Sequence, residues 1–167
     1  QGPRTIVFGH GFGTDQQAWR FVAPAFAARH QLVLFDHVGF GGSDRSAYAD
    51  ARHGDLAGYA QDLIDILDAL GLERVSYVGH SIGGVIGLLA SIQQPGRFDR
   101  LALLGSSPRF VNDPPDYVGG YERGDIEGIL DAMERDQIAW SESLAPAALG
   151  EESSEDLVHE FGNGLRA

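Results

Sequence analysis

The first 108 residues alternate between short, largely apolar runs and segments with helical spacing. The runs are residues 5–8, 32–35, 75–78 and 101–104. The segments between them, with apolar residues recurring at helical intervals, are 15–29, 56–70 and 82–92. Parallel strands need crossover connections and are buried on both faces, so they read as continuous apolar runs. The alternation therefore predicts an α/β fold: a parallel sheet with helices on both faces.

The pattern changes after Ser107. A turn-forming cluster, Asn112-Asp113-Pro114-Pro115, interrupts the chain, and two or three short helices without a strand are expected from Asp125 onward. We therefore predict two parts, a sheet domain over residues 1–108 with four parallel strands and a helical segment over residues 109–167.

Composition removes several classes of function. The chain has no cysteine, which excludes disulfides, zinc sites built on thiolates and a cysteine nucleophile. Its net charge of −12 disfavours nucleic acid and anionic membranes as partners. No histidine pair has metal-ligand spacing, so neither a metal nor another cofactor is expected. No apolar run is long enough to span a bilayer, and we expect a cytoplasmic protein.

One five-residue motif carries the chemistry: Gly79-His80-Ser81-Ile82-Gly83. A G-x-S-x-G match is weak alone, but here an expected strand leads into it and an expected helix follows it. Such a turn forces the central serine into a strained backbone and lifts its hydroxyl clear of the sheet. Gly79 and Gly83 are expected because side chains there would collide across the turn. Ser81 is therefore predicted to be a nucleophile.

A nucleophilic serine also needs donors for the oxyanion that forms on its substrate. The helix that begins at Ile82 directs its N-terminal N–H groups toward the reacting carbonyl, so the Ile82 N–H is one donor. The loop after the first strand, His10-Gly11-Phe12-Gly13, supplies the Phe12 N–H as the second donor. Two such motifs at one sheet edge favour a serine hydrolase.

The same residues resemble a known family. The two motifs, with Asp36-His37-Val38-Gly39-Phe40-Gly41-Gly42-Ser43-Asp44 between them, resemble the α/β-hydrolase superfamily. More narrowly, the chain is similar to RsbQ-like hydrolases, which regulate a bacterial stress sigma factor, and to their relatives, the plant karrikin and strigolactone receptors. The narrower resemblance rests on Tyr59-Ala60-Gln61-Asp62, on Ala90-Ser91-Ile92 before Pro95, and on Asn112-Asp113-Pro114-Pro115-Asp116-Tyr117 leading to Gly119-Gly120-Tyr121.

The resemblance implies the α/β-hydrolase fold with an incomplete helical cap over an apolar pocket. Aromatic residues that either line this pocket or pack in an ordinary core are Phe12, Phe110, Tyr117, Tyr121 and Trp140. In the family the triad Asp and His follow two later strands, and two strands precede the one at Thr5. We therefore expect both ends of the fold and both triad partners to lie outside this chain. On its own it should be inactive and should associate through unpaired sheet edges.

Other polar residues have structural interpretations. His159 lies in an expected helix and fits a solvated position better than a catalytic base. His10 is expected to shape the oxyanion loop, and His80 to point away from the site. Asp36 ends a strand and is expected to organise the glycine-rich loop, whereas Asp113 is expected to make a turn.

Three functions remain. The first is a carboxylesterase or lactonase that acts on a small apolar ester through an acyl-enzyme, either as an ordinary enzyme or as a stress-signalling regulator. The second is a slow or non-turnover sensor of such a molecule that acts through a signalling protein partner. The third, a dinucleotide-binding protein, is suggested by Gly9-His10-Gly11-Phe12-Gly13 after a strand, but Thr14 stands where that fingerprint needs Gly or Ala.

Overall fold

The chain folds into two compact units. The computed structural model describes residues 4–150 and 152–165. Unit 1 ends at Ser106 and unit 2 begins at Ser107.

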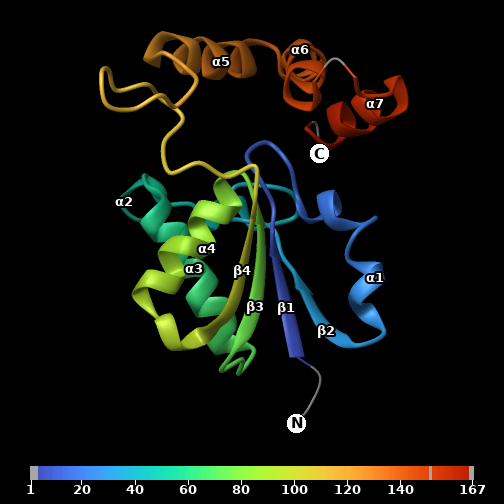
Figure 1. The fold of residues 1–167 in the computed structure, drawn as a ribbon, viewed down its shortest axis with the longest axis vertical. Coiled ribbons are helices and arrows are strands. Elements are labelled where there is room, and N and C mark those ends of the chain that lie inside the picture. The colour runs from blue at the N-terminus through green and yellow to red at the C-terminus, as the bar shows by residue number, and fades with distance from the viewer. Residues whose placement is uncertain (1–3, 151, 166–167) are drawn as a thin grey trace. The chain divides into compact units, whose positions relative to one another are not determined.

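Unit 1 is built on a four-stranded parallel sheet (Figure 1). Its strands, in the order β2-β1-β3-β4, are β1 (Arg4–Gly9), β2 (His30–Leu34), β3 (Val75–His80) and β4 (Phe98–Leu104). All three pairings are parallel, as the sequence predicts. Gly9 lies opposite Gly79 in the register of β1 and β3. The loops that follow these two strands therefore leave the sheet side by side.

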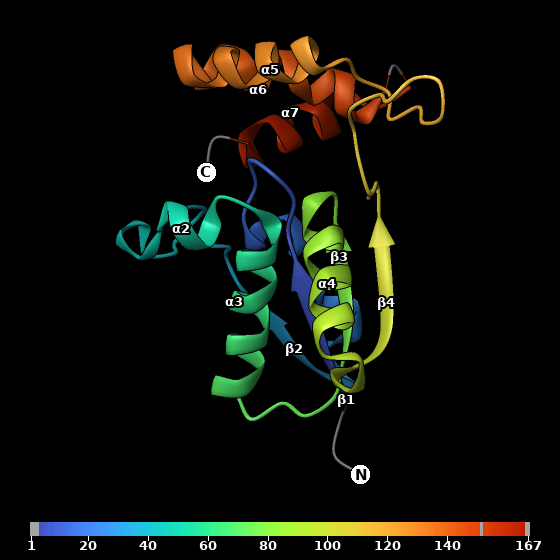
Figure 2. The ribbon, with the colours of Figure 1, turned by 90° about the vertical axis from the view of Figure 1, so that its left-hand side faces the viewer.

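Helices cover both faces of this sheet. In Figures 1 and 2, α3 and α4 lie on one face and α1 lies on the other. The elements that connect the strands are η1 (Gln16–Trp19), α1 (Pro24–Ala27), η2 (Arg45–Ala47), α2 (Asp50–His53), α3 (Leu56–Ala69), α4 (Ile82–Gln93) and η3 (Pro95–Arg97), where η marks a 3-10 helix. Gly71, with φ of 62°, follows Leu70 at the C-terminal end of α3, in the left-handed conformation that commonly ends a helix.

Two apolar clusters fill the space between the sheet and its helices. Side chains alternate between the faces of a strand, so Val7 joins one cluster while Ile6 and Phe8 join the other. The first cluster packs the sheet against α3 and α4, with its buried members Val7, Ala60, Leu63, Ile64, Leu67, Val75, Tyr77, Ile86 and Ala90. The second packs Ile6 and Phe8 against Trp19 and Ala23.

The predicted helix over residues 15–29 is wrong as a continuous element. The structure has a 3-10 helix at Gln16–Trp19 and a single helical turn at Pro24–Ala27. Pro24 has no N–H, and its ring collides with the carbonyl four residues earlier in a continuous helix, so it can only begin a helix here. The apolar residues of this segment still reach the sheet, because Trp19 and Ala23 are both buried.

Unit 2 begins with a folded loop and continues with three helices. Isolated bridges join Val111 to Tyr121 and Asp113 to Tyr117. The helices are α5 (Arg123–Arg135), α6 (Gln137–Leu149) and α7 (Glu155–Gly164), which agrees with the predicted run of short helices. Within the described part of the chain, no helix is both long and apolar enough to cross a membrane.

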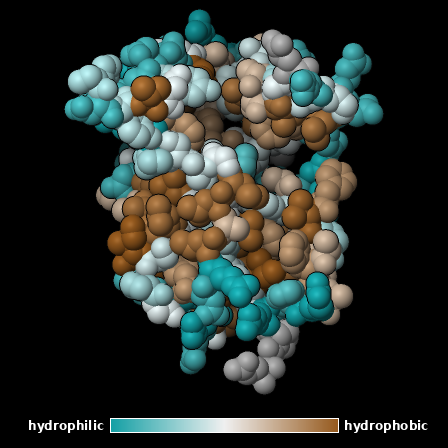
Figure 3. Space-filling view, viewed as in Figure 1, coloured by the Kyte–Doolittle hydropathy of each residue, from teal (hydrophilic) through white to brown (hydrophobic). Residues whose placement is uncertain are grey.

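The β4 side of unit 1 exposes apolar side chains. Among the described strands, β4 pairs only with β3, so its other edge carries unpaired backbone groups. Leu104 at the end of β4 is 47% exposed, and Ile92 on the neighbouring α4 is 66% exposed. Figure 3 shows apolar residues gathered over this face of unit 1. An edge of this kind favours pairing with another chain.

We expect the 167-residue chain to self-associate through this edge. Replacing Leu104 with Lys places a charge on the edge and should shift the chain toward monomer in size-exclusion chromatography with light scattering. Leu70→Lys, at an exposed leucine that follows α3, is the control and should leave the association unchanged. A monodisperse wild-type monomer at high concentration would refute this expectation.

Candidate active site

Ser81 occupies a strained turn between β3 and α4. β3 ends at His80 and α4 begins at Ile82, so Ser81 alone forms the connection. Its φ is 54° and its ψ is −125°, and it is the only non-glycine among the described residues with a positive φ. The Ser81 N–H donates to the Leu104 carbonyl at 2.8 Å, which ties the turn to the end of β4. The turn therefore has the backbone form of a nucleophile elbow.

The two glycines of the motif meet different neighbours. A Cβ on Gly79 would lie 2.5 Å from the Gly84 Cα, across the tight turn. A Cβ on Gly83 would overlap the His10 carbonyl oxygen in the loop after β1. Gly79 is thus required by the turn itself, and Gly83 by the close approach of the neighbouring loop.

Tyr77 fixes the start of α4 from inside the core. Its hydroxyl donates to the Gly83 carbonyl at 2.8 Å, and burial raises the pKa of this phenol well above its usual range. Side chains at Gly9 and Gly87 would overlap the tyrosine ring, so both glycines leave room for it. Sequence reasoning missed this contact; the available signal was a tyrosine inside an otherwise buried strand.

The loop after β1 packs directly on the elbow. A Cβ on Gly11 would lie 3.2 Å from the Ser81 Cβ and 2.7 Å from His80 Nδ1. The Gly11 carbonyl accepts hydrogen bonds from the Thr14 hydroxyl at 3.0 Å and from His10 Nδ1 at 2.9 Å. In a trans peptide the N–H points opposite to the preceding carbonyl. These two bonds therefore direct the Phe12 N–H away from His10 and Thr14.

His10 is held as a neutral imidazole. Its Nε2 accepts a hydrogen bond from the His37 N–H at 3.0 Å, so the ring proton must lie on Nδ1, which donates to Gly11. Burial lowers the pKa of His10, although its bond to Gly11 and the charge of Asp36 act in the opposite direction. The contacts agree with the predicted role of His10 in shaping this loop.

His37 is a second buried neutral histidine. It is 3% exposed, and its ring centroid lies 4.5 Å from that of His10. Neither ring nitrogen has a hydrogen-bond partner among the described residues. Burial, with a smaller effect from His10, lowers the pKa of His37 to about 3.

Asp36 organises the glycine-rich loop, as predicted. Its carboxylate accepts from the backbone N–H of Gln16 at 2.8 Å and of Gly42 at 2.9 Å, and its carbonyl accepts from the Ser43 hydroxyl. Burial raises the pKa of this carboxyl, but the bonds from Gln16 and Gly42 outweigh it and hold the pKa below its usual range.

No general base is in place at Ser81 within unit 1. Among its described residues, no imidazole or carboxylate hydrogen-bonds to the Ser81 hydroxyl. The His80 ring lies against Gly11 and Gly105, and burial lowers its pKa. His53 is paired with Asp62 at 3.0 Å. His159 lies on α7, 3.3 Å from the Asn163 side chain.

The aromatic residues predicted to line a pocket occupy both units. Phe12 lies in unit 1, with its ring centroid 6.0 Å from that of Phe40. In unit 2, Tyr117 donates to the Arg109 carbonyl, and the Tyr121 N–H donates to the Phe110 carbonyl, so these residues share one loop. Trp140 is buried on α6.

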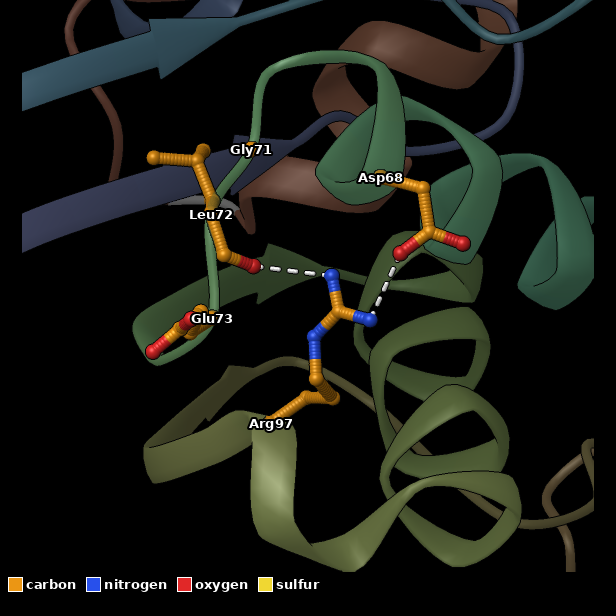
Figure 4. Close-up of a pocket in the computed structure, with 5 residues that line it drawn as sticks. All are labelled: Asp68, Gly71, Leu72, Glu73 and Arg97. Carbon is orange, nitrogen blue, oxygen red and sulfur yellow. Dashed lines mark hydrogen bonds and ion pairs between the residues drawn. The ribbon is translucent and has the colours of Figure 1, made fainter.

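A separate pocket of about 260 Å³ (Figure 4) lies beside the segments that lead into β3 and β4. It is lined by Asp68, Gly71, Leu72, Glu73 and Arg97. The Arg97 guanidinium bridges Asp68 at 2.7 Å and the Leu72 carbonyl at 2.8 Å. These contacts join the loop before β3 to η3. Elsewhere too, the described residues contain no cluster of three or more potential metal ligands.

Acid should destabilise the fold partly through His37. An unfolded histidine titrates near pH 6.5, so between about pH 6.5 and 3 the unfolded chain binds a proton that folded His37 does not. Stability should therefore fall as the pH is lowered through this range. His37→Asn should make the fall in Tm from pH 7 to pH 4 less steep. His30→Asn, at the start of β2, is the control. If Tm falls equally steeply with pH in His37→Asn and in the wild type, the prediction is contradicted.

Comparisons with known proteins agree with this geometry. The family described as alpha/beta hydrolase fold matches residues 4–138. A strigolactone esterase from Pisum sativum is 44% identical over 98% of this chain and 61% of its own length. Karrikin insensitive 2 receptor IA from Petunia hybrida is 38% identical over 98% of this chain and 60% of its own length.

Solved structures give the same result. A hydrolase from Oleispira antarctica superposes with a TM-score of 0.90 at 38% identity, covering 100% of this chain and 61% of that one. The chain thus spans about three fifths of the length of these relatives. The resemblance to RsbQ-like hydrolases and their plant receptor relatives is confirmed. The chain belongs to the α/β-hydrolase fold family.

Proposed function

We propose that this chain carries the nucleophile and the oxyanion hole of a serine hydrolase of the carboxylesterase or lactonase type. The observation that carries the proposal is the backbone of Ser81, with φ of 54° between β3 and α4, packed against the loop at Gly11. A strained single-residue turn of this kind presents a serine hydroxyl beside the N-terminus of a helix. We propose the N–H of Phe12, in the loop that packs on the elbow at Gly11, as the second backbone donor.

The proposed reaction is acyl transfer in two steps. Ser81 Oγ loses its proton to a base and attacks the carbonyl carbon, and the carbonyl oxygen becomes an oxyanion held by the Phe12 and Ile82 N–H groups. Collapse of this intermediate expels the alcohol, which takes up the proton, and leaves an acyl-serine. Water, deprotonated by the same base, attacks the acyl-serine, and a second collapse releases the acid and restores the Ser81 hydroxyl.

The base and its orienting carboxylate are proposed to lie outside these 167 residues. Two observations support this: unit 1 presents no imidazole bonded to Ser81, and the chain covers 61% of the strigolactone esterase. We further propose that residues 109–167 form a helical cap. Its aromatic residues Phe110, Tyr117, Tyr121 and Trp140, with Phe12, would then favour a small apolar ester or lactone.

A sensor that acts through a signalling protein partner is the second candidate. It is favoured by one observation, the 38% identity to a karrikin insensitive receptor over 98% of the chain. An enzyme and a sensor of this family differ in turnover. Rapid hydrolysis of many simple esters supports the enzyme, whereas slow turnover with partner capture that depends on the ligand supports the sensor.

Ser81→Ala tests the nucleophile. In the complete natural polypeptide that contains this sequence, the substitution should lower the hydrolysis of p-nitrophenyl acetate by about a thousandfold or more, because the attacking oxygen is lost. Ser91→Ala is the control, since that hydroxyl only donates to the Leu88 carbonyl on α4. Unchanged turnover in Ser81→Ala would refute the assignment.

The 167-residue chain alone should hydrolyse the ester at close to the background rate, because no base is hydrogen-bonded to Ser81 among the described residues of unit 1. The measurement is initial rate at several enzyme concentrations, with Ser81→Ala chain as the blank. Robust turnover by the chain that Ser81→Ala abolishes would show that the base lies within these residues.

Thr14→Val tests the proposed orientation of the Phe12 donor. Valine keeps the size of the side chain but cannot donate to the Gly11 carbonyl, so the loop should hold the Phe12 N–H less firmly. In the complete polypeptide kcat should fall by about tenfold while KM changes little. Thr5→Val, at a buried threonine on β1 whose hydroxyl donates to Gln31, is the matched control. A kcat for Thr14→Val equal to that of Thr5→Val would contradict the prediction.

A further inference from the structure

The hydroxyl of Ser106 contacts the backbone of the proposed nucleophile. Ser106 Oγ donates to the Ser81 carbonyl at 2.9 Å, and it lies 3.4 Å from the Leu104 carbonyl. The Ser81 N–H donates to that same Leu104 carbonyl at 2.8 Å. The two peptide groups that flank the Ser81 Cα are thus held by the last residue of β4 and by the segment that follows it.

Gly84 leaves the space that this hydroxyl occupies. A Cβ on Gly84 would overlap Ser106 Oγ and would lie 3.0 Å from Ser106 Cβ. Glycine lowers the stability of a helix, so its presence in the first turn of α4 needs a reason. Here that reason is the hydroxyl packed against it.

The chain conformation after β4 brings Ser106 to this position. Gly105, between β4 and Ser106, has φ of 57°, which lets the chain turn back toward the elbow. The Ser81 carbonyl already accepts the Gly84 N–H at 3.0 Å, as the first turn of a helix requires. The bond from Ser106 is therefore additional to those that the helix itself needs.

We propose that Ser106 is a positioning residue for the oxyanion hole, and that Gly84 is its necessary partner. The Ser81 carbonyl and the Ile82 N–H belong to one trans peptide group and point in opposite directions. A bond that fixes the carbonyl therefore fixes the direction of the Ile82 donor. This inference rests on the proposed function. It adds to that function by naming the residue that holds the Ile82 N–H in place.

The same device occurs on the other side of the proposed hole. There the Thr14 hydroxyl and His10 hold the Gly11 carbonyl, which belongs to the peptide group of the Phe12 donor. Each proposed donor, the Phe12 N–H and the Ile82 N–H, thus lies in a peptide group whose carbonyl accepts a hydrogen bond from a side-chain hydroxyl. Backbone donors that are fixed before the reaction stabilise developing charge more effectively than mobile ones.

Kinetics of the complete natural polypeptide provide the first test. Ser106→Ala should lower kcat for p-nitrophenyl acetate by about tenfold with KM changed less than about twofold, because the donor acts on the transition state. Gly84→Ala should give a similar loss by displacing the hydroxyl. The double variant should lose no more than the larger single loss, since both changes remove one contact. Ser106→Thr, which keeps a hydroxyl, should recover part of the rate.

Ser91→Ala is the matched control and should keep the wild-type kcat. A wild-type kcat in Ser106→Ala would overturn the proposal. The proposal would also be overturned if the fold-losses in kcat for Ser106→Ala and Gly84→Ala multiplied in the double variant. Independent effects of this kind would show that the two residues do not share a contact.

Amide hydrogen exchange in the 167-residue chain gives a readout that needs no activity. In Ser106→Ala, exchange of the hydrogen-bonded Ser81 and Gly84 N–H groups should quicken by about tenfold, while amides in the middle of β1 and β3 keep their rates. Unchanged exchange at both positions would overturn the proposal. If the complete wild-type polypeptide hydrolyses no ester, the proposed function fails, and the exchange result still decides whether Ser106 orders the elbow.

Discussion

A serine held at φ of 54° cannot be stable by itself, and much of unit 1 serves to hold it there. A non-glycine residue in such a sparsely populated conformation costs about 1–3 kcal/mol. The cost is offset by bonds from separate parts of the fold: Ser81 donates to the Leu104 carbonyl and accepts from Gly84 and Ser106. Tyr77 adds a bond from inside the core to the first turn of α4. The strained turn therefore depends on the register of β3 with β4 and on the position of the first turn of α4.

The parallel sheet explains why these parts meet. Because Gly9 pairs with Gly79, the loops after β1 and β3 leave the sheet next to each other, and Gly83 must lack a side chain to let them touch. β4 lies on the other side of β3 and supplies Leu104 and Ser106. Three neighbouring strands thus build one site at their carboxyl ends, where open α/β sheets place their ligands.

Buried neutral histidines support the loop after β1. His10 uses both ring nitrogens, one on the Gly11 carbonyl and one on the His37 N–H, so it joins the loops after β1 and β2. His37 packs against His10 and is kept neutral by burial. The loop after β1 is in this way held by uncharged imidazoles, and in the proposed reaction the charge of the oxyanion would be met by backbone N–H groups. Asp36 is a partly buried carboxylate in the same loop region, and it accepts hydrogen bonds from the backbone N–H groups of Gln16 and Gly42.

Local sequence pattern was enough to predict the parallel sheet, the elbow around Ser81 and the role of Asp36, because these follow from apolar runs, glycine spacing and a polar residue at a strand end. It did not predict the break at Pro24 in the expected helix, because the apolar spacing hid a residue that cannot continue one. The strand order and the contacts of Ser106 with Gly84 and Ser81 became visible only in the folded chain, because they join segments that strand register brings together and a partner 25 residues away leaves no local signal in the sequence. The bond from the Tyr77 hydroxyl to the Gly83 carbonyl spans only six residues, but it depends on how α4 folds back over the tyrosine ring.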